Sequence, residues 1–322
     1  MSKVKVELNN KTILVTGSPG FIGANLVLRL LQDMTSGTVI SLDNMNDYYD
    51  PKLKAYRLGL IEEAAKASTV KHIFIRGSIA DKTLVDQIFA DYKPSVVVNL
   101  AAQAGVRYSI DHPDVYIESN LIGFYNILEA CRHNPVEHLV YASSSSVYGG
   151  NKKIPFSTDD KVDNPVSLYA ATKKSDELLA HAYSKLYNIP STGLRFFTVY
   201  GPAGRPDMFY FSATNTLSRG GTIKIFNYGN CKRDFTYVDD IVEGLVPRHA
   251  GSAGETKRQR RPSSPALCRL QHRRWATGEP AGLHIYASGG TGQSRSASGR
   301  LRLRRSPGTS GDAARRRARN IC

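Results

Sequence analysis

The chain has 322 residues and a formal net charge of +15 at neutral pH. Almost all of this excess lies in residues 248–322, which hold 16 Arg, 1 Lys and 3 acidic side chains, whereas residues 1–247 hold 26 basic and 25 acidic ones. This distribution argues against a specific nucleic-acid partner, which would need a folded basic domain, and no apolar run approaches the ~18 residues of a membrane span. We therefore expect a cytoplasmic protein without a membrane partner.

Apolar runs of strand length alternate with longer amphipathic stretches up to Phe197. This alternation is typical of βαβ units and predicts an α/β fold with a doubly wound parallel sheet of the Rossmann type. The predicted strands are Thr12–Thr16, Val39–Asp43, His72–Ile75, Ser95–Leu100, His138–Ser143 and Ser191–Phe197. The predicted helices are Phe21–Gln32, Pro51–Lys66, Asp81–Asp91, Asp114–Arg132 and Leu168–Tyr187.

Composition divides the chain into three predicted regions. Residues 1–197 carry the sheet, and residues 198–247, rich in Gly and Pro, form a smaller and partial substrate lobe. Residues 248–322 form an Arg-rich tail. The four cysteines show no metal-type spacing, so no metal site is predicted.

A glycine-rich turn, Gly17-Ser18-Pro19-Gly20-Phe21-Ile22-Gly23, follows the first predicted strand and opens the first helix. Glycines there permit a tight turn and close approach of pyrophosphate to the helix N-terminus. Asp43 ends the second strand, where a carboxylate binds ribose hydroxyls and repels a 2′-phosphate. A purely structural turn would explain the glycines alone, but the combination predicts a cofactor site that favours NAD over NADP.

The predicted NAD contacts extend from this turn to the ends of the next strands. They are Gly17, Gly20, Phe21, Ile22, Gly23, Asp43, Ser78, Ile79, Ala101, Ala102, Gln103, Asn120, Tyr169 and Lys173. Ser78 and Ile79 would lie by the adenine ring, and the later residues by the pyrophosphate and the nicotinamide ribose. Asn120 taken alone fits a helix-surface role nearly as well.

Tyr169 and Lys173 lie one turn apart on one face of the predicted helix Leu168–Tyr187. A tyrosine with the ordinary pKa of about 10 is protonated at neutral pH, and a fixed ammonium favours the phenolate. The pair therefore predicts a general base, although a surface Tyr and Lys give the same spacing by chance. The serine run Ser143–Ser146 ends the fifth strand, where ligands of such sheets bind, and strengthens the catalytic interpretation.

These motifs resemble the extended short-chain dehydrogenase/reductase family, specifically its NAD-dependent epimerases and dehydratases of nucleotide sugars. The resemblance runs from about Lys11 to Gly244 and is carried by TGSPGFIG, LAAQAGVRYS, ASSSSVYG, YAATKK, LRFFTVYGPAGRPDM and RDFTYVDDIVEG. It implies that Ser144, Tyr169 and Lys173 are the catalytic residues; Ser144 is placed by counting back from VYG, and Ser143 or Ser145 remain alternatives. The chain departs from the family at Ser78, where Asp is usual.

Two of these motifs, LAAQAGVRYS and RFFTVYGPAGRPDM, are similar to those of UDP-glucuronate 4-epimerases. This implies inversion of C4 of a UDP-sugar, UDP-glucuronate to UDP-galacturonate, through a transient 4-keto sugar. Dehydratases of the family place acids where this chain has Ser145 and Ser146. UDP-glucose 4-epimerase and a catalytically inert NAD-binding fragment are the alternatives, and a homodimer is left open.

The predicted substrate contacts are Ser145, Ser146, Thr198, Arg205 and Arg233. The first four offer neutral donors and one cation to a sugar carboxylate, although Arg205 also fits an exposed loop. Arg233 resembles the family's diphosphate-binding arginine, and its alternative is an ion pair with Asp239 or Asp240.

Amino-acid usage switches abruptly near position 248: Lys outnumbers Arg 17 to 9 before it, and Arg outnumbers Lys 16 to 1 after it. The scarcity of large apolar residues predicts a disordered tail. A phosphate-binding arm is the functional alternative, but Trp275 and Tyr286 alone give little base stacking. We infer translation in a shifted reading frame, and expect the chain as written to bind its substrate poorly.

Overall fold

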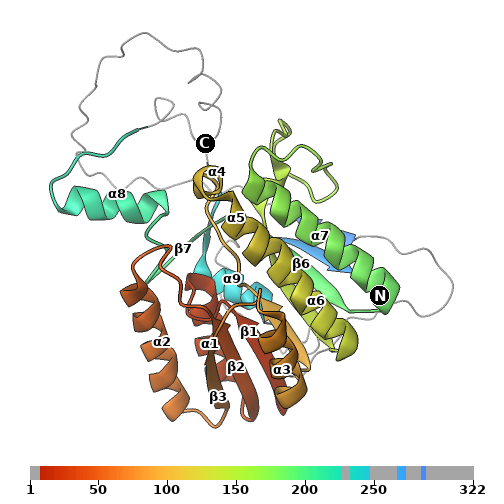
Figure 1. Cartoon of the computed structure of the whole chain (residues 1–322). Coiled ribbons are helices and arrows are strands. Elements are labelled where there is room, and N and C mark those ends of the chain that lie inside the picture. Colours follow the sequence, from red (N-terminus) through yellow and green to blue (C-terminus); the bar gives the residue numbers. More distant parts are fainter. Residues whose placement is uncertain (1–7, 226–232, 247–266, 273–283, 288–322) are drawn as a thin grey trace, which may run out of the picture.

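The main sheet of the computed structural model has the strand order β3-β2-β1-β4-β5-β6, with all six strands parallel. The structure describes residues 8–225, 233–246, 267–272 and 284–287 (Figure 1). The parallel strands are β1 (Lys11–Thr16), β2 (Gly37–Asp43), β3 (Lys71–Arg76), β4 (Val96–Asn99), β5 (His138–Ser144) and β6 (Ser191–Phe196). The predicted doubly wound fold is confirmed, and the strand order reverses between β1 and β4, where such sheets bind ligands.

Helices cover both faces of this sheet (Figure 1). One layer holds α1 (Phe21–Asp33), α2 (Pro51–Lys66) and α9 (Val238–Leu245), and the other holds α3 (Lys82–Tyr92), α6 (Gly123–His133) and α7 (Leu168–Tyr187). In β4 the alternation of side chains is visible, because Val96 and Val98 join the α1 core and Val97 joins the α3 core. Both faces are therefore buried, as the apolar strand runs predict.

The long helix predicted over Asp114–Arg132 is divided in the structure. It begins as α5 (Pro113–Tyr116), passes through a π-helical segment, η1 (Ile117–Ile122), and continues as α6. A short helix, α4 (Tyr108–Asp111), precedes it and was not predicted. The wider π turn carries Asn120, which is 1% exposed, and such turns often occur at functional sites. The spacing of apolar residues could not predict this π turn, because one residue inserted into a helix changes the spacing little.

The segment after β6 contributes three further elements. A two-stranded parallel sheet joins β7 (Thr198–Tyr200) to β8 (Phe235–Tyr237), and α8 (Phe209–Ser218) lies between them in the chain. Helix α9 ends at Leu245, and the sequence Leu245-Val246-Pro247 predicts an end of the helix there. Within the described residues, none of the helices is long and apolar enough to cross a bilayer.

Two segments of the predicted disordered tail form strands. β9 (Leu267–His272) pairs antiparallel with β6, and β10 (His284–Ala287) pairs antiparallel with β9. The sequence predicts disorder for the tail, whereas these two segments are extended and paired, and the edge of β6 supplies the backbone groups with which β9 pairs. The remainder of the predicted tail lies outside the described residues.

Candidate active site

The glycine-rich turn forms a cradle at the end of β1. Gly17 has φ +70°, and a Cβ atom on it would lie 2.8 Å from the backbone nitrogen of Ala101. A Cβ atom on Gly20 or Gly23 would lie 2.8 Å or 2.2 Å from the carbonyl oxygen of Gly17. Helix α1 begins at Phe21, and no side chain caps the backbone N–H groups of its first turn. The turn therefore leaves those N–H groups able to bind a pyrophosphate.

Asp43 lies at the end of β2 and is 9% exposed. Its Oδ1 atom accepts a hydrogen bond from the backbone nitrogen of Met45 at 2.7 Å and lies 3.4 Å from Nζ of Lys54. Burial lowers the pKa of Lys54, while the nearby Asp43 opposes that change. The carboxylate is thus fixed where the sequence predicts ribose binding, beside a buried cation that the sequence analysis missed.

Ser78 and Ile79 follow β3, next to Asp43, because the backbone nitrogen of Gly77 donates to the carbonyl oxygen of Asp43 at 3.0 Å. Ser78 accepts a hydrogen bond from the backbone nitrogen of Ala80 at 3.1 Å. The Ile79 side chain is 4% exposed and belongs to the core against Gly123. Ile79 therefore presents mainly its backbone to the site.

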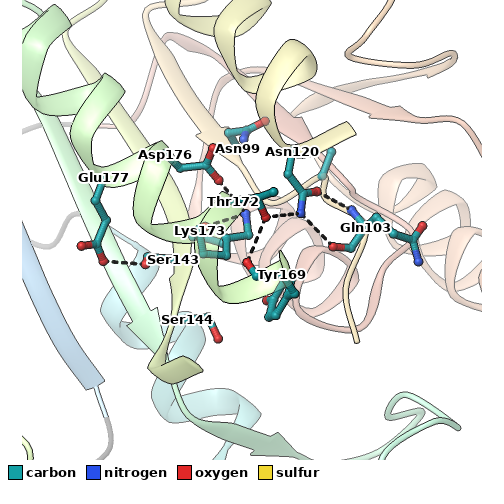
Figure 2. Close-up of polar contacts among 12 residues, drawn as sticks. Asn99, Gln103, Asn120, Ser143, Ser144, Tyr169, Thr172, Lys173, Asp176 and Glu177 are labelled. Atoms are coloured by element: carbon teal, nitrogen blue, oxygen red, sulfur yellow. Dashed lines mark hydrogen bonds and ion pairs between the residues drawn. The ribbon is translucent and has the colours of Figure 1, made fainter. Parts of the chain in front are cut away.

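The loop after β4 is tied to α7 through Asn120 (Figure 2). Asn120 accepts from the backbone nitrogen of Gln103 at 2.8 Å and donates to the Gln103 carbonyl oxygen at 3.1 Å. It also donates to Oγ1 of Thr172 at 3.0 Å, and Thr172 donates to the carbonyl oxygen of Tyr169 at 2.9 Å. Asn120 therefore joins the predicted cofactor loop, which begins at Ala101 and Ala102, to the helix that carries Tyr169.

Tyr169 lies in the first turn of α7, which Ser167 caps by accepting a hydrogen bond from the backbone nitrogen of Ala170 at 3.1 Å. Lys173 follows one turn later, is 3% exposed, and donates to the carbonyl oxygen of Ala142 at 3.1 Å. Ser144 at the end of β5 lies on the side of α7 from which Tyr169 projects (Figure 2). The structure thus brings the three predicted catalytic residues to one end of the sheet.

The four serines have different surroundings. Ser143 is 3% exposed and donates to Oε1 of Glu177 at 2.6 Å, so its hydroxyl points into the core. Ser144 is partly exposed and accepts hydrogen bonds from the backbone nitrogen and the hydroxyl of Ser146, at 3.2 and 2.9 Å. Ser145 is also partly exposed. The geometry favours Ser144 over Ser143 as the residue available to a substrate.

The predicted substrate arginines lie in different settings. Arg205 makes two hydrogen bonds to Asp207, at 3.0 and 2.5 Å, and its side chain is 27% exposed. Arg205 also lies within electrostatic range of Tyr169. Arg233 is exposed and directly precedes the segment that leads into β8, which pairs with the strand of Thr198.

Arg57 is a buried residue that supports the site and that the sequence did not reveal. It is 1% exposed, and its guanidinium donates to the carbonyl oxygens of Ala203, Gly204 and Pro19 at 2.7 to 3.2 Å. Arg57 thereby connects the glycine-rich turn to the loop that carries Arg205. The sequence shows only that Lys54 and Arg57 share a helix face with the apolar Ile61, and this spacing does not identify the partners of either cation.

The residues present fit a dinucleotide. The glycine cradle has no room for side chains, the N-terminus of α1 is uncapped, and a fixed carboxylate ends the next strand. A phenol and an ammonium on α7 and a serine hydroxyl at the end of β5 lie close together beside the same sheet. Fold and site together define an NAD-dependent enzyme of the short-chain dehydrogenase/reductase type.

Comparison with known proteins gives the family. The model of the NAD dependent epimerase/dehydratase family matches residues 13–256, so the chain belongs to that family. It is 53% identical over 233 residues to Protein CapI of Staphylococcus aureus, covering 72% of this chain and 67% of CapI. It is 47% identical over 268 residues to UDP-glucuronate 4-epimerase 4 of Arabidopsis thaliana, covering 80% of this chain and 59% of that enzyme.

Among solved structures, the chain is similar to UDP-glucuronic acid 4-epimerase of Bacillus cereus in complex with UDP-glucuronic acid and NAD. The TM-score is 0.67 and the identity 36%, with 73% of this chain and 72% of the other covered. The predicted membership of the family, the fold and the NAD dependence are thereby confirmed.

Proposed function

We propose that the chain inverts C4 of UDP-glucuronate to form UDP-galacturonate, and the reverse. The observation that carries the proposal is the placement of Arg205 within electrostatic range of Tyr169, at a site that already holds Ser144 and Lys173. A cation there suits a sugar that carries a carboxylate. The similarity to 4-epimerases of UDP-glucuronate supports the same substrate.

In the proposed reaction, Tyr169 as the phenolate takes the proton of the sugar 4-hydroxyl, and Ser144 donates a hydrogen bond to the same oxygen. Lys173 favours the phenolate by its charge. NAD⁺, which the glycine cradle and Asp43 would hold, would supply the hydride acceptor and donor for C4 of the sugar. Tyr169 then gives its proton back to the inverted hydroxyl, so no proton or electron is gained or lost overall.

The proposed substrate contacts divide between the sugar and the diphosphate. Ser145, Ser146 and Thr198 supply neutral donors to the carboxylate, and Arg205 supplies the charge. Arg233 binds the diphosphate from the exposed segment before β8. The NAD contacts are those of the glycine cradle, Asp43 and the loops after β3 and β4.

One experiment distinguishes the proposal from its two alternatives, a UDP-glucose 4-epimerase and an inert NAD-binding fragment. The chain and a frame-corrected version are each incubated with NAD and either UDP-glucuronate or UDP-glucose, and the sugar products are separated by chromatography. Galacturonate formed from the first substrate supports the proposal, whereas exclusive conversion of UDP-glucose would refute it. An inert fragment would convert neither, and UDP-glucose 4-epimerase is not favoured by the relatives.

A homodimer is proposed as the state in solution, and light scattering that gives the mass of one chain would refute it.

We also propose that residues after Val246 are read in a shifted frame, on the evidence of the change in amino-acid usage. The nucleotide sequence tests this directly, because a frame change near codon 246 should restore a continuation similar to the family. A cytoplasmic location stays a prediction.

A further inference from the structure

Asp176 is a buried carboxylate on the catalytic helix that the proposed reaction does not use. It lies three residues after Lys173 and seven after Tyr169, so the three side chains follow one face of α7 (Figure 2). Asp176 is 2% exposed, and its Oδ2 atom accepts a hydrogen bond from Nζ of Lys173 at 3.0 Å. Lys173 therefore has Tyr169 one turn before it and a carboxylate one turn after it.

The surroundings of Asp176 leave its charge poorly compensated. Its Oδ1 atom is buried without a hydrogen-bond partner. The titratable groups against it are Lys173 and Glu177 of α7 and Tyr141 of β5, and burial raises the pKa of Asp176 to about 6. Glu177 is itself held by Arg195 and Ser143. Within the part of the chain that the structure describes, the cation in contact with Asp176 is Lys173.

The negative charge of Asp176 opposes the electrostatic effect of Lys173 on Tyr169. Lys173 favours the phenolate of Tyr169 because its positive charge offsets the negative charge that forms there. When Asp176 is ionised, the Lys173–Asp176 pair has little net charge, and the electrostatic help to Tyr169 is reduced. When Asp176 is neutral, the whole charge of Lys173 acts on Tyr169.

We propose that Asp176 is a tuning residue, whose charge sets the pH at which Tyr169 gives up its proton by opposing the charge of Lys173. The proposal rests on the assignment of Tyr169 as the base, but its test does not require turnover. Replacing the charge while keeping an oxygen that accepts from Lys173 separates tuning from positioning, and Asp176→Asn makes that change.

The experiment follows tyrosinate absorbance against pH in the full chain, without substrate. The difference between the chain and Tyr169→Phe isolates the titration of Tyr169, and the same difference is measured in the Asp176→Asn background. The midpoint should move to lower pH by about one unit, since one charge two helical turns away is removed in a partly shielded site. An unchanged midpoint, or one that moves to higher pH, would overturn the proposal.

Controls exclude a general effect of removing an acid. Asp86→Asn removes the carboxylate of an exposed Lys–Asp pair on α3, and it should leave the midpoint unchanged. Asp176→Glu keeps the charge and should stay within a few tenths of a unit of the parent. If Asp176→Asn does not fold, judged by circular dichroism, Asp176→Ser makes the same test with a smaller side chain. Loss of epimerase activity without any shift of the midpoint would assign Asp176 a structural role and refute tuning.

Discussion

Lys54 Nζ lies 3.4 Å from Oδ1 of Asp43, and both side chains are less than one-tenth exposed. Lys54 is also held by Asn46, whose Oδ1 atom accepts its hydrogen bond at 2.7 Å. A fixed cation thus contacts the carboxylate that is proposed to bind the adenosine ribose. The negative charge of Asp43 offsets the positive charge of Lys54. Removing the charge of Asp43 would leave Lys54 able to attract an anionic group of a nucleotide.

Asp43→Asn should therefore do more than weaken NAD binding. We expect NAD affinity to fall by about 10-fold to 150-fold, the worth of one hydrogen bond to a charged group. NADP affinity should rise, because Lys54 can then attract the 2′-phosphate. Titration calorimetry with both nucleotides checks this. Adding Lys54→Met should abolish the gain for NADP, and unchanged binding of both nucleotides by the single variant would remove Asp43 from the ribose site.

Tyr169→Phe should lower turnover by roughly 10²-fold to 10⁴-fold while leaving the shape of the site intact, because it removes the proton acceptor. The initial rate of product formation by the frame-corrected chain with saturating UDP-glucuronate measures this. Tyr183→Phe is the matched control, since it removes a phenol from the same helix that is bonded to Glu129. Equal effects of the two substitutions would show that Tyr169 is not the base.

The layers, the strand order and the glycine turn could be predicted because each depends on local signals: apolar runs, helix periodicity and glycine spacing. The different environments of Ser143 and Ser144 could not be predicted, because successive side chains of a strand lie on opposite faces and the sequence does not say which of them meets Glu177 of α7. Arg57 was missed for a related reason. Its partners are backbone carbonyl oxygens of Ala203 and Gly204, about 146 residues away, and carbonyl groups leave no mark in a sequence.

Arg57→Lys tests whether that tether needs the guanidinium fork. Lysine keeps the charge but cannot donate to three carbonyl oxygens in one plane, so part of the loop 201–205 should lose its support. We expect the free energy of unfolding to fall by about 2 to 3 kcal/mol, the usual cost of unpaired buried groups. Urea unfolding measures this. Arg132→Lys, at a more exposed position, is the control and should change little.

The pH dependence of stability should reveal the buried Asp176. Its pKa is raised to about 6 from an ordinary value of 3.8, mainly by burial, so the folded state holds this proton more tightly than the unfolded chain does. The stability it provides is therefore lost as the pH rises from about 4 to about 6, by roughly 3 kcal/mol. Urea unfolding of the chain and of Asp176→Asn across this range isolates the contribution. If the free energy of unfolding depends on pH in the same way for both proteins, the contribution of Asp176 is contradicted.

The pairing of Arg205 with Asp207 bears on the choice of sugar. A substrate carboxylate must share the guanidinium with Asp207, whose Oδ2 atom also accepts a hydrogen bond from Tyr48 at 3.2 Å. Arg205→Ala should lower kcat/KM for UDP-glucuronate by about 10-fold to 150-fold more than for UDP-glucose, because only the former loses a charged partner.

Asp207→Asn should act in the opposite direction. It removes the competing charge and leaves Arg205 in place, so it should strengthen binding of UDP-glucuronate relative to UDP-glucose.

Both variants are best compared in a frame-corrected chain, where the family-like continuation is restored, and in the chain as written, where binding of both sugars should be weak. Competition binding of the two UDP-sugars gives the ratio without requiring turnover. Equal losses for the two sugars in Arg205→Ala would remove Arg205 from the carboxylate site, and strong activity of the uncorrected chain would refute the proposed frame change.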